Sequence, residues 1–193
     1  MSNSYLDLVK QTFNFPQEGI DVKDGYLHFN GLDLKSLIAK HGTPLKLTYL
    51  PKIGMQIKKA KQMFANAFKR NKYEGKYFYC YCTKSSHFSF VVEEALKHDI
   101  NLETSYAYDI EIIKKLYAKK KVTKDIHIIC NGFKQKGYTR RIAGLLNDGW
   151  QNVIPVLDNK EELKEYATSV KVPFKLGIRV AAEEEPNFPF YTS

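Results

Sequence analysis

The sequence predicts an α/β fold built around a parallel β-sheet. Short apolar runs typical of buried strands alternate with segments of helical spacing, and the predicted strands recur about every 23–32 residues. Such repeats are typical of βα units, whose parallel strands carry helices outside the sheet. Two architectures fit the residues: a doubly wound open sheet complete at six strands, and a (β/α)8 TIM-like barrel of which about six of eight units are present.

The predicted strands are rich in apolar, aromatic and β-branched residues. Residues 77–82 form a near-continuous aromatic and cysteine run, as expected for a buried strand of a parallel sheet. Gly42-Thr43-Pro44 precedes the first predicted strand, and Asn131-Gly132 ends the fourth. The six predicted strands are residues 45–50, 77–82, 100–104, 125–130, 153–157 and 174–180.

Helices are predicted between these strands, because apolar residues recur there at the spacing of one helix face. In residues 53–70 that face holds Ile53, Ile57, Phe64 and Phe68. Asp158 or Asn159 is expected to cap the last helix, because short polar side chains satisfy free backbone N–H groups. The other predicted helices are residues 88–96, 108–117, 142–146 and 159–170.

The first 42 residues follow a different pattern. Residues 20–29 alternate in polarity around Asp24-Gly25, a strong signal for a β-hairpin turn. A helix is predicted over residues 33–41. We therefore expect two domains: residues 1–42, a hairpin and helix that contribute to a β-domain, and residues 43–193, an incomplete α/β domain.

The composition indicates which kinds of partner and which cellular compartment to expect. The chain has 193 residues and a net charge of +9, which favours anionic partners such as nucleic acid, anionic membrane or a phosphorylated ligand. Its basic residues form short separate clusters rather than one stripe, as on solvated helix faces. The longest apolar runs are far shorter than the roughly 20 residues that span a bilayer, and the chain begins without a secretory signal pattern. We therefore predict a cytoplasmic protein without a membrane span.

The cysteines and histidines give a weak metal signal. Three cysteines make an odd number without a disulfide framework, which favours a reduced compartment. Cys80, Cys82 and Cys130 lie near two histidines, His87 and His127, but no Cys-x-x-Cys or paired-histidine spacing is present. Buried packing thiols are the favoured interpretation, and His87 is expected to pack at a helix start.

Candidate chemistry lies at the carboxyl ends of the predicted strands, where parallel α/β folds build their sites. Lys84 follows the aromatic strand, where apolar walls would favour the neutral, nucleophilic amine; the alternative is a lysine that reaches solvent. Glu103 either influences the protonation of Lys84 or forms a strand-end ion pair. Arg179 pairs either with Glu103 or with an anionic ligand oxygen. Gly-x-Gly-x-x-Gly, P-loop and Gly-x-Ser-x-Gly motifs are absent, which argues against dinucleotide, NTP and α/β-hydrolase chemistry.

Five motifs in register resemble the biosynthetic arginine decarboxylases, pyridoxal-phosphate (PLP) enzymes with an alanine-racemase-like barrel. The most specific is Cys130-Asn131-Gly132-Phe133-Lys134, which related ornithine and diaminopimelate decarboxylases lack in that form. The resemblance extends over about residues 40–180. The motifs are residues 42–44, 81–84, 102–105, 129–134 and 176–180.

The resemblance implies a fold, a reaction and a site. It favours the barrel and a decarboxylase that converts arginine to agmatine in polyamine and spermidine biosynthesis. Lys84 would form the Schiff base with PLP, Glu103 would lie near it, and Arg179 would lie near the cofactor. Family members are homodimers or higher homo-oligomers, and magnesium is implied by the family alone. Further family features are expected beyond residue 193, so this portion is expected to be incomplete and inactive by itself.

Departures from the family pattern keep two alternatives open. Ser86 stands where the family usually has Asn, and Thr104 replaces the Ala of a Leu-Glu-Ala-Gly-Ser motif. A PLP-binding homologue or regulator without catalytic activity is therefore one alternative. The second is a basic nucleic-acid-binding α/β domain, suggested by the charge but without an aromatic and basic recognition motif. The resemblance leaves three substrates open, since family members that share this scaffold act on arginine, diaminopimelate or carboxynorspermidine.

Overall fold

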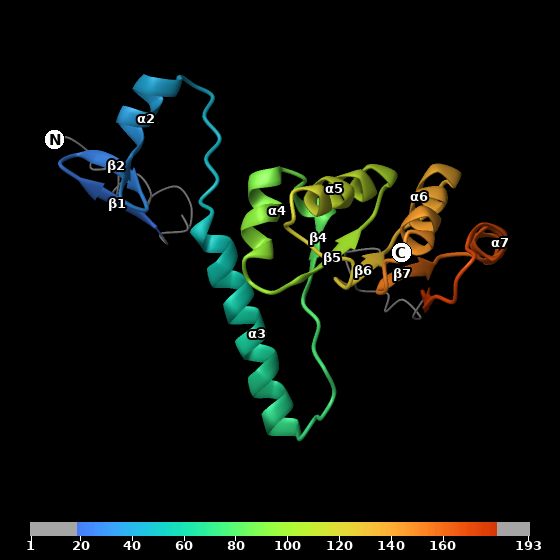
Figure 1. Ribbon diagram of the computed structural model, residues 1–193. Helices are drawn as coiled ribbons and strands as arrows, with labels where there is room; N and C mark the ends of the chain where they lie inside the picture. Colours follow the sequence, from blue (N-terminus) through green and yellow to red (C-terminus); the bar gives the residue numbers. More distant parts are fainter. Residues whose placement is uncertain (1–18, 181–193) are drawn as a thin grey trace, which may run out of the picture. The chain divides into compact units, whose positions relative to one another are not determined.

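A computed structural model of the protein describes residues 19–180 (Figure 1). The chain divides into two units after Thr48, the N-terminal unit (residues 1–48) and the sheet unit (residues 49–193). The sequence placed this boundary after residue 42. Each unit is described by itself.

The N-terminal unit contains the predicted hairpin. Strands β1 (Ile20–Lys23) and β2 (Tyr26–Phe29) pair antiparallel, and Lys23 lies opposite Tyr26. Asp24 and Gly25 both have positive φ, at 50° and 77°, as the two central residues of a type I′ turn require. The prediction of a hairpin at Asp24-Gly25 is confirmed.

A third short strand and a helix complete the described part of this unit. Strand β3 (Leu32–Asp33) pairs with β2, and helix α2 (Leu34–His41) follows it directly. Asp33 caps the helix, since its Oδ1 accepts the backbone N–H of Lys35 at 2.9 Å and its Oδ2 accepts the hydroxyl of Ser36. The hydroxyl of Ser36 and the Lys35 amide hold the pKa of Asp33 below its ordinary value.

The sheet unit alternates strands and helices along the chain. It begins with the long helix α3 (Pro51–Asn71), with proline at its first position, where no hydrogen-bond donor is needed. A 3-10 turn, η1 (Thr83–Ser85), follows the first strand. The strands are β4 (Cys80–Cys82), β5 (Asn101–Thr104), β6 (Ile128–Cys130), β7 (Val153–Leu157) and β8 (Gly177–Ile178); the helices between them are α4 (Ser89–Leu96), α5 (Ala107–Ala118), α6 (Lys136–Asn147) and α7 (Lys160–Ser169).

The five strands form one parallel sheet whose spatial order is the chain order, β4-β5-β6-β7-β8 (Figure 1). Each strand is joined to the next through a helix, so the α/β class and the parallel sheet are confirmed. A doubly wound sheet changes direction at a switch point between strands. The order β4 to β8 contains no such reversal among residues 80–178.

Burial alternates along the central strands. Leu102, Thr104, Ile128 and Cys130 are fully buried, whereas the residues between them on each strand are partly exposed. Side chains of a strand alternate between the two faces of its sheet, so one face carries the core and the opposite face is more open. The core consists of this covered face and the inward sides of the helices; its fully buried helical residues include Ile110, Ile142 and Tyr166.

Four strand predictions differ from the structure: residues 125–130 and 174–180 are shortened to β6 and β8, and two others differ as follows. Residues 45–50 form no strand: they cross the boundary between the units and pair with no strand of the described chain, so the parallel sheet has five strands rather than six. The predicted strand 77–82 is reduced to β4. Its ladder begins where Cys80 meets Asn101, the first residue of β5. Before it, the Tyr79 carbonyl accepts the Asn101 N–H at 2.8 Å, and residues 77 and 78 pair with no strand of the described chain.

The described helices differ from membrane spans in length or in apolarity. The longest, α3, is interrupted throughout by lysine and arginine. None of the helices between residues 19 and 180 combines the length and apolarity that crossing a membrane requires.

Candidate functional site

A cavity of about 860 Å³ opens at the carboxyl ends of the parallel strands. Residues that follow each of the five strands line it: Lys84 after β4, Tyr106 after β5, Asn131 after β6, Asp158 after β7 and Arg179 after β8. This is the end of the sheet at which parallel α/β folds gather their functional groups. Lys84 and Arg179, two of the three predicted site residues, therefore share one cavity.

Lys84 lies in η1, directly after the first strand of the sheet. The turn is anchored on both sides of it: Thr83, fully buried, donates its hydroxyl to the backbone carbonyl of Glu103 at 3.1 Å, and Ser85 donates to that of Cys82 at 2.7 Å. The side chain of Lys84 itself is exposed. The enclosing apolar walls expected from the sequence are therefore not what surrounds it, and its amine is accessible from the cavity.

Glu103 lies beside the cavity rather than in its lining. It is partly buried on the open face of β5, and its Oε1 accepts hydrogen bonds from Asn131 Nδ2 at 3.3 Å and Cys82 Sγ at 3.5 Å. Burial and the charge of Glu103 raise the pKa of the Cys82 thiol, which stays protonated and able to donate. Asn131, which does line the cavity, thus connects Glu103 to it.

The loop that carries Asn131 has a defined backbone. The Asn131 Oδ1 accepts the N–H of Gly132 at 2.9 Å, and the Asn131 N–H continues the ladder to Thr104 O. Gly132 has φ +75°, a backbone conformation that favours glycine. Because Oδ1 is occupied in this way, the Nδ2 group of Asn131 faces Glu103.

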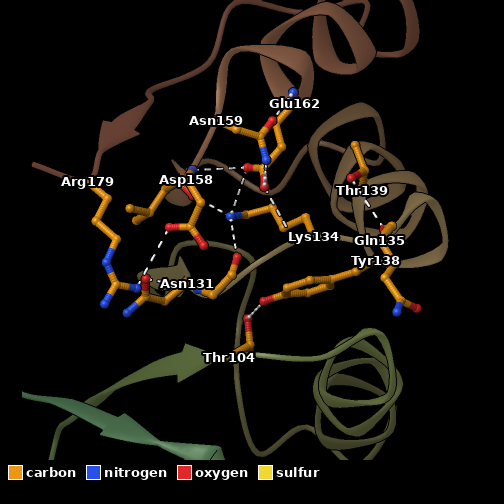
Figure 2. Close-up of polar contacts among 12 residues, drawn as sticks. Thr104, Asn131, Lys134, Gln135, Tyr138, Thr139, Asp158, Asn159, Glu162 and Arg179 are labelled. Atoms are coloured by element: carbon orange, nitrogen blue, oxygen red, sulfur yellow. Dashed lines mark hydrogen bonds and ion pairs between the residues drawn. The ribbon is translucent and has the colours of Figure 1, made fainter. Parts of the chain in front are cut away.

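Arg179 pairs with Asp158 rather than with Glu103. Its Nη1 lies 3.7 Å from Asp158 Oδ1, and its backbone N–H bonds Leu157 O at 3.0 Å. Figure 2 shows the two paired side chains. Asp158 Oδ1 is buried and makes no hydrogen bond within the described chain. The guanidinium is partly exposed, and among residues 19–180 its side chain makes a polar contact with Asp158 only, which leaves donors suited to an anionic ligand.

Two helices begin at the cavity. Ala107 and Tyr108 open α5, while Gln135, Gly137 and Tyr138 come from the start of α6. Both helices thus point the positive end of their dipoles toward the cavity, although Asp109 offsets this at α5. The Tyr138 hydroxyl bonds Thr104 Oγ1 at 2.7 Å, and burial raises its pKa, so it remains a neutral phenol.

Two buried carboxylates hold the loops around the cavity. Asp109 Oδ2 accepts the N–H groups of Ser105 and Tyr106, and its Oδ1 lies 2.9 Å from His87 Nε2. Glu162 likewise accepts the backbone N–H groups of Lys134 and Asp158. Neither carboxylate was predicted from the sequence to be a site residue, and Asp158 was predicted only as a possible helix cap. His87, half-exposed just before α4, therefore contacts the Asp109 carboxylate through its Nε2 atom.

The cysteines differ in accessibility. Cys130 is fully buried on the covered face, and burial raises its pKa to about 12; Cys80 and Cys82 are partly buried on the open face. No three histidine, cysteine or acidic side chains of residues 19–180 cluster as metal ligands do.

The native thiols are expected to react unequally. With a disulfide reagent such as DTNB at pH 8, Cys80 and Cys82 should be modified slowly, because they are partly exposed but burial raises the pKa of both thiols. Cys130 should react only after denaturation, because its thiolate is strongly disfavoured by complete burial. A Cys130→Ala variant should keep the native titre and lose one thiol from the denatured titre. Three thiols reacting at one rate in the native protein would contradict this arrangement.

The arrangement brings an accessible amine, a guanidinium and a carboxamide to one cavity bordered by aromatic rings. Such a set suits an anionic ligand that also carries a carbonyl group able to react with an amine. No protein-family model matches the chain, and no curated protein matches it significantly in sequence.

Proposed function

We propose that this chain is part of a PLP-dependent amino-acid decarboxylase, with Lys84 as the lysine that bears the cofactor. One observation carries the proposal: the Lys84 amine and the Arg179 guanidinium line the same cavity at the carboxyl ends of a parallel sheet. The motif resemblance points to arginine as the substrate and agmatine as the product. It also points to a cytoplasmic homodimer or larger homo-oligomer.

The proposed architecture is part of a (β/α)8 barrel. The strictly sequential strand order and the single covered face of the sheet support it, since barrel strands follow the chain order and carry their helices outside. The open face, which holds Glu103, would then be the barrel interior. In such barrels the carboxyl ends of the strands form the active site.

The residues present fit PLP. A cavity of about 860 Å³ lies within the usual size range of small-molecule sites. The exposed amine of Lys84 would hold the cofactor's aldehyde group, and the free donors of Arg179 suit an anionic oxygen of the cofactor or substrate. Tyr106 and Phe133, exposed aromatic side chains of the cavity lining, would border the ring.

PLP, when bound, would supply the electron sink that accepts the electron pair left behind when carbon dioxide departs. The chain's own groups would orient the bound molecules and move protons. Asn131 and Cys82 hold the carboxylate of Glu103 at Oε1, and Asn131 extends this network to the cavity. Lys84, on the cavity wall, would be the group that moves a proton near the reacting carbon, and Glu103 would orient Asn131 from beside the cavity. Asp158 would keep Arg179 directed at the cavity.

Borohydride trapping tests this function. The 193-residue chain is mixed with PLP, reduced with borohydride and mapped by peptide mass spectrometry. We expect the reduced pyridoxyl group mainly on Lys84, and its loss from that peptide in Lys84→Ala. Lys120→Ala, which removes an exposed lysine at the end of α5, is the matched control and should leave the labelling of Lys84 unchanged. Label scattered over surface lysines would contradict the proposal.

The same trapping experiment on the Arg179→Gln variant tests the role of the guanidinium. Removing a charge-assisted contact to an anionic oxygen is expected to weaken PLP capture at Lys84 about tenfold or more. Inorganic phosphate should compete with PLP in the unaltered chain and much less in the variant. If Arg179→Gln captured PLP as well as the unaltered chain, Arg179 would have no part in holding the cofactor.

A further inference from the structure

The sheet unit contains a buried ion pair that lies outside the cavity lining. The side chains of Lys134 and Glu162 are 0% and 4% exposed, and their Nζ and Oε2 atoms lie 3.2 Å apart. Lys134 comes from the loop between β6 and α6, and Glu162 from the first turn of α7. Figure 2 shows the pair between these two segments.

The hydrogen bonds of the pair are complete. Lys134 Nζ donates to Gly132 O at 2.8 Å, to Val156 O and to Glu162 Oε2, so each of its three N–H groups has an acceptor. This geometry leaves no donor of the ammonium free for a ligand or for proton transfer. Its role is therefore internal to the protein.

Glu162 accepts hydrogen bonds from the loop before α6 and from the loop before α7. Its Oε1 accepts the Lys134 N–H at 3.2 Å and the Asn159 Nδ2 at 3.3 Å, while its Oε2 accepts the Asp158 N–H at 3.3 Å. Lys134 and Glu162 thus bind the backbone of the β6–α6 loop and of the β7–α7 loop at several points. A change in either side chain would release both loops together.

These two loops carry cavity residues. Asn131, Gly132 and Phe133 lie just before Lys134, and Asp158 lies in the loop before α7. Asn131 in turn contacts Glu103, and Asp158 contacts Arg179. The ion pair is therefore one contact away from the cavity lining, through Gly132 and Asp158, and two contacts away from Arg179.

Stability alone is a poor reason for such a pair. Removing two charges from water is unfavourable, and an apolar pair of similar size is often as stable or more stable at a buried position. An apolar pair would fill the space but could not bond the two loops. We propose that Lys134 and Glu162 are positioning residues that fix the two loops, and through them Asn131 and Asp158, in the conformation that accepts the ligand.

The double variant Lys134→Met/Glu162→Leu separates positioning from stability, because it keeps the volume of the pair without its charges. Hydrogen exchange is measured on the amides of residue 134 and Asp158, which bond Glu162, and on the amides of β6. We expect exchange at the two loop amides to rise about tenfold, with β6 unchanged and the melting temperature retained. The exposed pair Lys119–Glu93, replaced by Lys119→Ala/Glu93→Ala, is the control and should leave the loop amides unchanged.

A second measurement, which rests on the proposed function, concerns ligand binding. It gives the dissociation constant of PLP from the change in PLP absorbance. This constant should rise about tenfold or more in the double variant, because displaced loops no longer present a preorganised site. Retained melting temperature with unchanged exchange and unchanged PLP affinity would overturn the proposal. If the unaltered chain bound no PLP, the proposed function would fail, and the exchange measurement alone would decide whether the pair positions the loops.

Glu162→Gln keeps the inference testable if the double variant does not fold. Glutamine has nearly the same shape and retains one acceptor oxygen, so fewer contacts are lost. We expect faster exchange of the Asp158 amide and weaker PLP binding, both by about threefold. An unchanged result in both measurements would overturn the proposal independently of the double variant.

Discussion

Replacing Ile128 by alanine is expected to lower the free energy of unfolding of the sheet unit by about 2–5 kcal/mol. Ile128 lies on β6, the central strand of the parallel sheet, and its side chain is fully buried on the covered face. Truncation would remove buried methyl and methylene groups and leave a cavity that the rigid sheet cannot close. Trp150, the one tryptophan of the chain, is buried in the same core and reports denaturant unfolding of this unit.

Ile129→Ala is the matched control for this prediction. It changes the same residue type on the same strand, but on the partly exposed opposite face. We expect a loss of about 1 kcal/mol, in line with the smaller apolar area that its side chain removes from water. Equal losses in the two variants would mean that the second face is covered as fully as the first, and the description of a one-sided sheet would be wrong.

Asp109→Ala is expected to lower the free energy of unfolding by about 2–3 kcal/mol. The carboxylate is fully buried and accepts the Ser105 and Tyr106 N–H groups at 2.8 and 3.1 Å. Alanine would leave both donors without a partner at the start of α5 and remove the contact with His87. Chemical denaturation followed by Trp150 fluorescence measures the loss.

Two further variants define the cause of that loss. Asp109→Asn retains one acceptor oxygen and is expected to lose about half as much stability. Glu111→Ala removes an exposed carboxylate of the same helix, where it pairs with Arg141, and should change stability by less than about 0.5 kcal/mol. If Asp109→Ala were as mild as Glu111→Ala, the hydrogen bonds to the loop before α5 would contribute little.

The fold was largely predictable because the signals that determine it are local. The alternation of apolar strands with helices predicts the parallel sheet, and Asp24-Gly25 predicts the hairpin through its backbone preference. Strand lengths were less predictable, since a strand extends only as far as its partner does. The aromatic run 77–79 has the composition of a strand and yet lies beyond the first residue of β5.

The candidate site was predictable in part. Lys84 and Arg179 were found because polar residues at strand ends meet at one edge of a parallel sheet. Asp109 and Glu162 were missed because acidic residues in the first turn of a helix usually indicate a solvated end. Their burial and their bonds to loops from other βα units depend on how helices pack, which the sequence pattern does not express.

Strand β8 has only two residues, and its weak attachment allows one side of the cavity to open. β8 pairs with β7 through two register pairs, Val156 with Gly177 and Leu157 with Ile178, and Arg179 follows immediately. Local opening requires least free energy where few backbone bonds hold a segment. Brief detachment of β8 would carry the guanidinium away while Lys84, anchored by the buried Thr83, stays in place. The two ends of the cavity are therefore expected to differ in lifetime: the Lys84 side persists, whereas the Arg179 side forms again each time β8 pairs with β7.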